Sequence, residues 1–190
     1  MNDCDCKNAP TDPTPRRRVI RLAAAGVAIG LGGIGSAPAR AAPTKDDRLV
    51  ADDVQGEPVA LRPADLTPGK PLLAFAFDPK TKEVRNTSRL HKLVLVKFAE
   101  SELDAETKQR AAGGVLAYSA ICTHQACEVK TWVAKEKALV CFCHASKFLM
   151  LEKAKVADGP ASRALPSLPL ALKEAQLVVA GTFSAKPGPG

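Results

Sequence analysis

One stretch of this 190-residue chain, from Tyr118 to Phe148, holds four of its six cysteines and two of its three histidines. The stretch contains two short motifs that each combine cysteine with histidine: Cys122-Thr123-His124 and, sixteen residues later, Cys141-Phe142-Cys143-His144. Thiolates and imidazoles are common ligands of transition metals in proteins. Two of each at this spacing suit a metal site with one sulfur end and one nitrogen end. We therefore expect the rest of the chain to serve as a scaffold for these motifs.

The two motifs closely resemble the cluster-binding boxes of the Rieske [2Fe-2S] family, and the resemblance covers about residues 113–181. A Rieske cluster divides its two irons between thiolate and imidazole ligands. The resemblance therefore implies one [2Fe-2S] cluster per chain. The implied ligands are two cysteines for one iron and two histidines for the other: Cys122 and Cys141, and His124 and His144. It also implies that Cys127 and Cys143 form a disulfide between the two loops.

The same resemblance implies an all-β fold, a Rieske-type antiparallel β sandwich with a small cluster-binding subdomain at about residues 118–166. Strong helix formers in Ser101–Ala112, followed by two glycines, predict one inserted helix. The segment between Phe77 and Leu90 predicts a hairpin, and the Pro- and Gly-rich end of the chain is expected to be mobile. Apolar runs predict strands near residues 49–50, 59–61, 72–77, 90–98, 115–119, 129–133, 137–140, 154–156, 169–172 and 176–180.

Other positions match residues that surround the cluster in the family. Ser146 matches a serine that donates to a bridging sulfide in high-potential members. Phe148 stands where those members often have a tyrosine that donates to a ligand sulfur. Hydrogen bonds to sulfur stabilise the reduced cluster and raise its midpoint potential, and with Phe148 one such bond is absent. We therefore expect a midpoint potential below that of quinol-oxidising subunits. We expect it to lie above that of Rieske oxygenases, which generally lack the disulfide pair. Residues 158–166 resemble the proline loop that covers the cluster.

A structural zinc site is the alternative, because two cysteines and two histidines also make a tetrahedral zinc shell. Such a chain would be a zinc-stabilised binding module. Zinc motifs usually pair like ligands, as Cys-x(2–4)-Cys and His-x(3–5)-His, whereas each motif here supplies one of each. Zinc would also leave Cys127 and Cys143 without a role. These features favour the iron-sulfur interpretation.

Residues 1–41 have the pattern of a twin-arginine export signal. Arg16 and Arg17 begin the run RRRVIR, an Ala- and Gly-rich apolar segment follows, and a small-x-small cleavage site ends at Ala41. This export route moves folded proteins, so a cluster inserted in the cytoplasm can cross with the chain. We predict a periplasmic Rieske domain at residues 42–190. In the alternative, the apolar segment stays as an inner-membrane anchor with the domain facing the periplasm.

The remaining residues limit the chemistry. Of the three histidines, only His91 lies outside the two motifs. A non-heme iron oxygenase needs two further histidines and a carboxylate for its catalytic iron, so this chain is not expected to be such an oxygenase. The chain has no Cys-x-x-Cys-His motif for covalent haem. Its 27 basic and 20 acidic residues are interspersed and form no Lys/Arg stripe with aromatics, so we expect no nucleic-acid partner. These features predict an electron-transfer subunit of an oxidoreductase complex.

Two kinds of family member fit this prediction: the iron-sulfur subunit of cytochrome bc complexes and the arsenite oxidase small subunit. Quinol-oxidising members commonly have Leu and Gly where this chain has Gln125 and Ala126, and Pro and Gly where it has Phe142 and Ala145. Because Gln125 replaces an apolar side chain that helps to dock quinol, we expect a protein redox partner. That partner is a c-type cytochrome or a catalytic dehydrogenase or oxidase subunit. Direct oxidation of quinol stays as the alternative.

Overall fold

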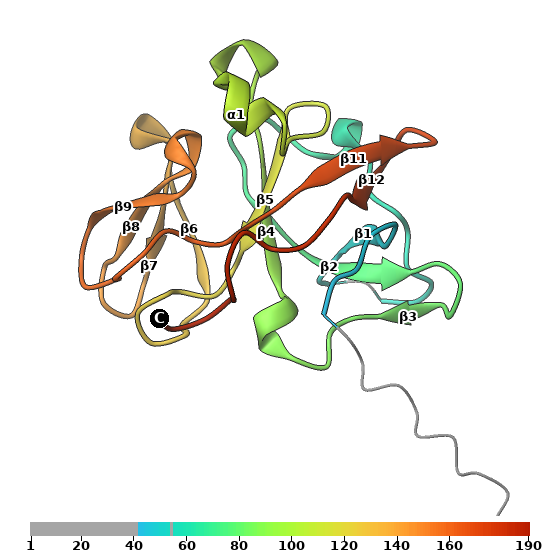
Figure 1. The fold of residues 1–190 in the computed structure, drawn as a ribbon, viewed down its shortest axis with the longest axis horizontal. Coiled ribbons are helices and arrows are strands. Elements are labelled where there is room, and N and C mark those ends of the chain that lie inside the picture. The colour runs from blue at the N-terminus through green and yellow to red at the C-terminus, as the bar shows by residue number, and fades with distance from the viewer. Residues whose placement is uncertain (1–41, 54) are drawn as a thin grey trace, which may run out of the picture. The chain divides into compact units, whose positions relative to one another are not determined.

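The computed structural model describes residues 42–53 and 55–190. The predicted export signal, with Arg16 and Arg17, lies outside these residues. Among the residues described, none of the helices has both the length and the apolar character needed to cross a membrane. The fold consists mainly of two antiparallel sheets (Figure 1).

The larger sheet has eight strands in the order β10-β5-β4-β2-β1-β12-β11, with β3 paired to β2. Only Pro169 separates β10 from β11, which stand at the two ends of this order, so the sheet nearly closes into a barrel. Its strands are β1 (Arg48–Ala51), β2 (Leu72–Asp78), β3 (Glu83–Val84), β4 (Leu93–Lys97), β5 (Val115–Ser119), β10 (Ser167–Leu168), β11 (Leu170–Lys173) and β12 (Gln176–Val179).

The smaller sheet has four strands in the order β6-β7-β8-β9 and lies beside β4 and β5 (Figure 1). Its strands are β6 (Val129–Val133), β7 (Ala138–Cys141), β8 (Lys147–Leu149) and β9 (Lys155–Asp158). Every strand pair in both sheets is antiparallel. The predicted all-β class is therefore confirmed.

The strand β4 contributes to two hydrophobic cores, one on each of its faces. Leu93 and Leu95 pack inside the larger sheet, whereas Val94 and Val96 pack in the core that also contains Phe148 of the smaller sheet. Successive side chains of a strand point to opposite faces, so a strand covered on both sides needs an unbroken apolar run. This requirement explains the sequence LVLV in β4. Packing on both faces of β4 anchors the smaller sheet to the larger one.

Helical structure differs from the prediction. The one α-helix in the described residues, α1 (Ala105–Lys108), is much shorter than the predicted span 101–112. Leu103 is extended and only 5% exposed, so burying its side chain in the core interrupts the expected helix. Asp104 caps α1 by accepting the Thr107 N–H at 2.6 Å. Short 3-10 helices occur at Pro63–Asp65, Arg89–His91, Glu100–Glu102, Ala134–Glu136 and Met150–Glu152.

Other differences are local. The predicted strand at residues 59–61 is absent from the described strands, although Leu61 still donates to the Leu49 carbonyl and accepts from the Leu177 N–H. The sequence patterns did not predict the short strands β3, β8 and β10. The predicted strands at residues 72–77 and 90–98 pair with each other as β2 and β4, with Leu73 opposite Val94. Strand β3 lies in the segment between them and pairs with the end of β2, with Phe77 opposite Val84.

One buried hydrogen bond ties the two sheets together. The Tyr118 hydroxyl, on β5, donates to the Met150 carbonyl beyond β8 at 3.0 Å. Tyr118 is 2% exposed and Met150 is fully buried. Burial raises the pKa of Tyr118, so its phenol stays protonated and acts as a donor.

Tyr118→Phe keeps the ring and removes this hydrogen bond. Because a buried carbonyl then loses its donor, we expect the free energy of unfolding to fall by about 1–3 kcal/mol. Urea denaturation of the holoprotein measures the change. Val59→Ala, at a side chain that is 72% exposed, is the control and should change stability by less than about 0.5 kcal/mol. Equal stabilities of Tyr118→Phe and the unsubstituted chain would contradict this role.

Candidate metal centre

The two motifs form loops at neighbouring ends of the two sheets. The first loop follows β5 and is closed by the Cys122 N–H, which donates to the Cys127 carbonyl at 2.8 Å. The second loop leaves the end of β7 and returns as β8, with the Cys141 N–H donating to the Ser146 carbonyl at 2.8 Å. Each loop turns through an alanine with positive φ, Ala126 at 58° and Ala145 at 57°. These alanines adopt a backbone conformation that favours glycine.

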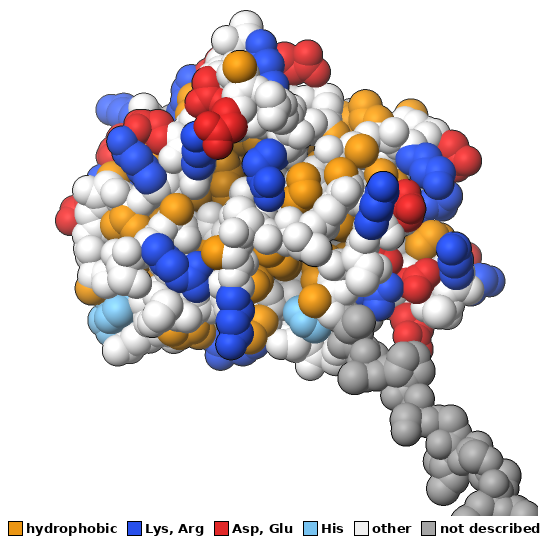
Figure 2. Space-filling model, viewed as in Figure 1, with side chains coloured by type: hydrophobic (Ala, Val, Ile, Leu, Met, Phe, Trp, Pro, Cys, Tyr) orange, Lys and Arg blue, Asp and Glu red, His pale blue; other side chains and the backbone are white. Residues whose placement is uncertain are grey.

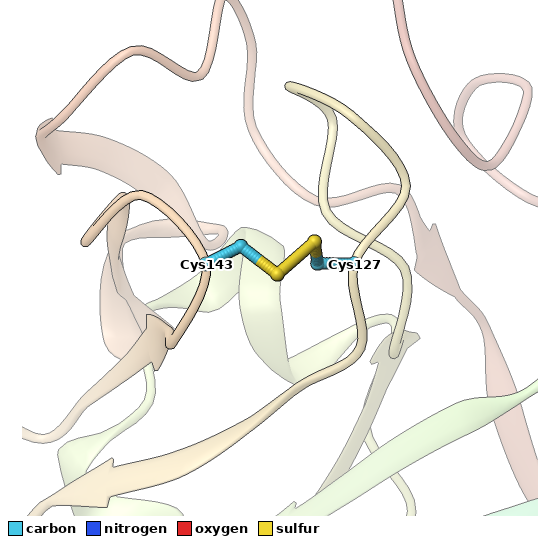
Figure 3. Close-up of a disulfide and its surroundings, with 2 residues drawn as sticks. All are labelled: Cys127 and Cys143. Atoms are coloured by element: carbon cyan, nitrogen blue, oxygen red, sulfur yellow. A yellow bond between two sulfur atoms is a disulfide. The ribbon is translucent and has the colours of Figure 1, made fainter.

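A disulfide joins the two loops. Cys127 of the first loop and Cys143 of the second are bonded, with their Cα atoms 6.5 Å apart (Figure 3). The predicted pairing is thus confirmed. Because the bond links segments that follow β5 and β7, it fixes the separation of the two motifs that it joins.

The two remaining cysteines of the motifs are free thiols that face each other. Cys122 and Cys141 are each 1% exposed, and their side chains are within hydrogen-bonding distance. Burial raises the pKa of the Cys122 thiol, whereas hydrogen bonds from the His124 and Gln125 N–H groups act in the opposite direction. A metal ion would supply the positive charge that such buried sulfurs need as thiolates.

The two histidines of the motifs also meet. The rings of His124 and His144 lie 4.8 Å apart between centroids and are nearly perpendicular, at 87°. His124 is partly buried, and its Nδ1 atom is buried without a hydrogen-bond partner. His144 is exposed. An unpartnered buried ring nitrogen costs free energy unless it binds something, so Nδ1 of His124 suits a metal ligand.

The four side chains therefore divide into a buried sulfur pair and a more exposed nitrogen pair, which fits a [2Fe-2S] cluster with Rieske-type ligands. His91, the third histidine, lies in a 3-10 helix, and burial lowers its pKa.

Ser146 and Phe148 lie just behind the second loop, and both are fully buried. The Ser146 Oγ accepts the Ala161 N–H at 3.1 Å, which leaves its own hydroxyl hydrogen for another acceptor. Phe148, on β8, pairs with Leu139 of β7 and packs in the core of the smaller sheet.

The segment at residues 158–166 packs against both loops. Gly159 has a φ of 84°, and a Cβ at this position would lie 2.5 Å from Ser146 Cα. Only glycine permits so close an approach to the second loop. On the other side, the Thr123 hydroxyl of the first loop donates to the Arg163 carbonyl at 2.6 Å. This segment therefore holds the two loops from one side.

The end of the chain extends this network, contrary to the expected mobility. One guanidinium nitrogen of Arg163, Nη2, donates to the carbonyls of Lys186 and Gly188, each at 2.7 Å. The Gly190 N–H donates to the Thr123 carbonyl at 3.3 Å. Sequence reasoning missed Arg163, because its partners are carbonyl groups that carry no side-chain signal.

Comparisons with known proteins agree with this geometry. The family model described as the Rieske [2Fe-2S] domain matches residues 59–169. A putative respiratory nitrate reductase Rieske subunit of Haloferax mediterranei is 40% identical over 99 residues, which cover 51% of this chain and 44% of that protein.

Two cytochrome bc1 complex Rieske iron-sulfur subunits are also similar. That of Corynebacterium diphtheriae is 44% identical over 78 residues, covering 40% of this chain and 19% of the relative. That of Streptomyces lividans is 30% identical over 135 residues, covering 68% of this chain and 78% of the relative. The matches thus span less than half the length of the Haloferax and Corynebacterium relatives.

Gly159→Ala should disrupt the metal centre, because the added methyl group collides with the backbone of Ser146. Gly69→Ala is a matched control, since Gly69 also has a positive φ, 69°, but a Cβ there meets no atom within 4 Å. The control should lose about 1–2 kcal/mol of stability from backbone strain alone. We expect Gly159→Ala to lose more and to retain less iron per chain, as measured by denaturation and metal analysis. Equal losses in both variants would contradict the close packing of this segment.

Proposed function

This chain belongs to the Rieske [2Fe-2S] family, and from that premise we propose that it transfers single electrons as the iron-sulfur subunit of a periplasmic or membrane-associated oxidoreductase. The proposed ligands are the two thiols for one iron and the two imidazoles for the other: Cys122 and Cys141, and His124 and His144. When bound, a [2Fe-2S] cluster supplies a site that accepts and returns one electron. The observation that carries the proposal is the division into a buried sulfur pair and a more exposed nitrogen pair.

The protein's own groups set the environment of the proposed cluster. The N–H groups of His124 and Gln125 donate to the Cys122 sulfur, and the Ser146 hydroxyl is free to donate beside Cys141. Donors to sulfur stabilise added negative charge and raise the potential. Phe148 adds only apolar surface. Because Phe148 has no hydroxyl to donate, this position supports a potential below that of members with a tyrosine there.

The exposed end supports electron exchange through the histidines. His144 is exposed, and the neighbouring Phe142 side chain is 89% exposed. An exposed aromatic residue beside a ligand offers apolar contact area to a partner. We propose a protein partner, either a c-type cytochrome or a catalytic dehydrogenase or oxidase subunit. The relatives named as subunits of bc1 and nitrate reductase complexes support assembly into a complex.

Direct oxidation of quinol is a second candidate, and exposed Phe142 is the observation that favours it, because an aromatic ring can contact a quinol ring. Gln125, which is also exposed, disfavours it by placing a polar amide where quinol-oxidising members have an apolar side chain. Phe142→Ala and Gln125→Leu separate the two candidates in stopped-flow reduction by a soluble quinol. Quinol oxidation requires that the first slows and the second accelerates cluster reduction.

For localisation, we propose that residues 1–41 direct export through Arg16 and Arg17 and that residues 42–190 form the exported domain. The Cys127–Cys143 disulfide supports an oxidising compartment such as the periplasm. Mass spectrometry of the native protein distinguishes cleavage after Ala41 from a retained inner-membrane anchor.

Metal analysis and low-temperature EPR test the proposed cofactor. We expect two irons and two acid-labile sulfides per chain, and a rhombic signal after reduction with an average g below the free-electron value. Reduction by ascorbate alone would indicate a high potential, whereas a need for dithionite would indicate a lower one. One zinc per chain, with no EPR signal under either condition, would support a zinc-stabilised binding module instead.

Substitutions behind the second loop test the proposed roles of Ser146 and Phe148. Ser146→Ala removes a sulfur donor and should lower the midpoint potential by roughly 60 mV, which corresponds to about 1.4 kcal/mol for one electron. Phe148→Tyr should raise the potential by a similar amount, because the added hydroxyl supplies a donor to a ligand sulfur. Redox titration followed by EPR measures both shifts.

Phe98→Tyr is the control for Phe148→Tyr, because it introduces a hydroxyl at another buried site, where Phe98 is 5% exposed. Its midpoint potential should stay unchanged. A midpoint potential for Phe148→Tyr that is unchanged or lower would refute the role assigned to this position.

A further inference from the structure

A cleft of about 330 Å³ lies under α1, between β5 and the segment that follows the metal centre. Its floor is apolar and includes Leu116, Leu165 and Leu168. Its basic lining residues come from three separate segments: Arg110, Lys153 and Arg163. On the face shown in Figure 2, apolar side chains lie among Lys and Arg side chains below the region of α1. The cleft is distinct from the two ligand loops.

The two arginines of the cleft have no acidic partner among the residues that the structure describes. Lys153 pairs with Glu106, the one carboxylate that lines the cleft. Within residues 42–53 and 55–190, neither Arg110 nor Arg163 forms an ion pair with a carboxylate. Both arginines are only partly exposed. A partly buried charge without a counter-charge is costly, and a bound anion would reduce that cost.

Each guanidinium is held in place but keeps an unused donor. Arg110 donates through Nη2 to the Ser167 carbonyl at 2.9 Å, while its Nε is buried without a partner. Arg163 donates through Nη2 to two backbone carbonyls, while its Nη1 is buried without a partner. Because backbone carbonyls already hold these side chains in place, binding would cause a smaller loss of side-chain conformational entropy. Guanidinium groups bind carboxylate and phosphate oxygens through charge-assisted hydrogen bonds, so two fixed arginines in the lining favour an anion.

We propose that this cleft binds a small organic anion, with an apolar body over the leucine floor and a carboxylate or phosphate group at Arg110 and Arg163. The volume lies within the usual range for small-molecule sites, about 300–1,000 Å³. The charge of the lining selects an anion, and the apolar floor selects a body larger than that of a simple ion. This site is separate from electron transfer and does not depend on the proposed function.

Isothermal titration calorimetry of the holoprotein at low salt tests the proposal with four probes. Benzoate and phenyl phosphate carry an apolar ring and an anionic group, benzyl alcohol carries the ring alone, and acetate carries the carboxylate alone. We expect saturable binding of at least one aromatic anion. Its affinity should exceed those of benzyl alcohol and acetate by about tenfold or more, because a charge-assisted hydrogen bond contributes about 1.5–3 kcal/mol. The preference between benzoate and phenyl phosphate identifies the anionic group.

Arg110→Gln should weaken binding of the preferred anion about tenfold or more. Lys153→Gln changes an exposed side chain of the same cleft and should weaken anion binding less. It replaces Arg110→Gln as the test if that variant fails to fold, because it lowers the positive charge of the cleft without changing a buried contact. Lys173→Gln is the control, since Lys173 lies outside this cleft. Three results would overturn the proposal: no saturable binding of either aromatic anion, equal affinity for benzyl alcohol, or equal weakening by Lys173→Gln.

Discussion

The metal centre depends on the disulfide between Cys127 and Cys143. The two motifs lie in separate loops, one after a strand of the larger sheet and one after a strand of the smaller sheet. Hydrogen bonds close each loop internally, but the covalent bond joins one loop to the other. A cross-link with a sequence separation of 16 contributes about 3 kcal/mol in the chain-entropy description. This bond therefore holds the two loops together.

The sheets supply the rigid base from which these loops extend. Strand β4 is buried on both faces, so the larger sheet and the smaller sheet share one of its hydrophobic cores. The Tyr118 hydroxyl bond to Met150 adds a polar link inside that shared core. Because both cores constrain β4 and β5, a change in one sheet affects the position of the loop that leaves the other. The fold therefore positions the motifs through packing as well as through the disulfide.

Burial makes the two ends of the centre different. The free thiols lie inside, where loss of solvation disfavours negative charge unless a metal is bound, and the histidine rings lie nearer to solvent. Gly159 and Thr123 attach the covering segment to both loops, and Arg163 attaches the end of the chain to that segment. The covering layer protects one side of the centre and leaves the histidine side accessible to a partner.

The sequence alone determined the chemistry of the motifs, because that chemistry depends on residue types at short spacing, a local property of the chain. Apolar runs, which are also local, located most of the strands. The all-β class and the disulfide pairing were implied by the resemblance of the motifs to the Rieske family, and the structure confirms both. The proposed ligands and the roles of Ser146 and Phe148 came from the resemblance to the Rieske family, and the structure places these residues in one region.

Only the tertiary structure decided the remaining features. Strong helix formers surround Leu103, yet burial of this side chain in the core shortens the helix to α1. The contacts of Arg163 with the end of the chain, and the cleft that this residue shares with Arg110, join segments far apart in the sequence. Local propensity carries no information about such pairings, because their free energy arises only when the sheets bring the segments together.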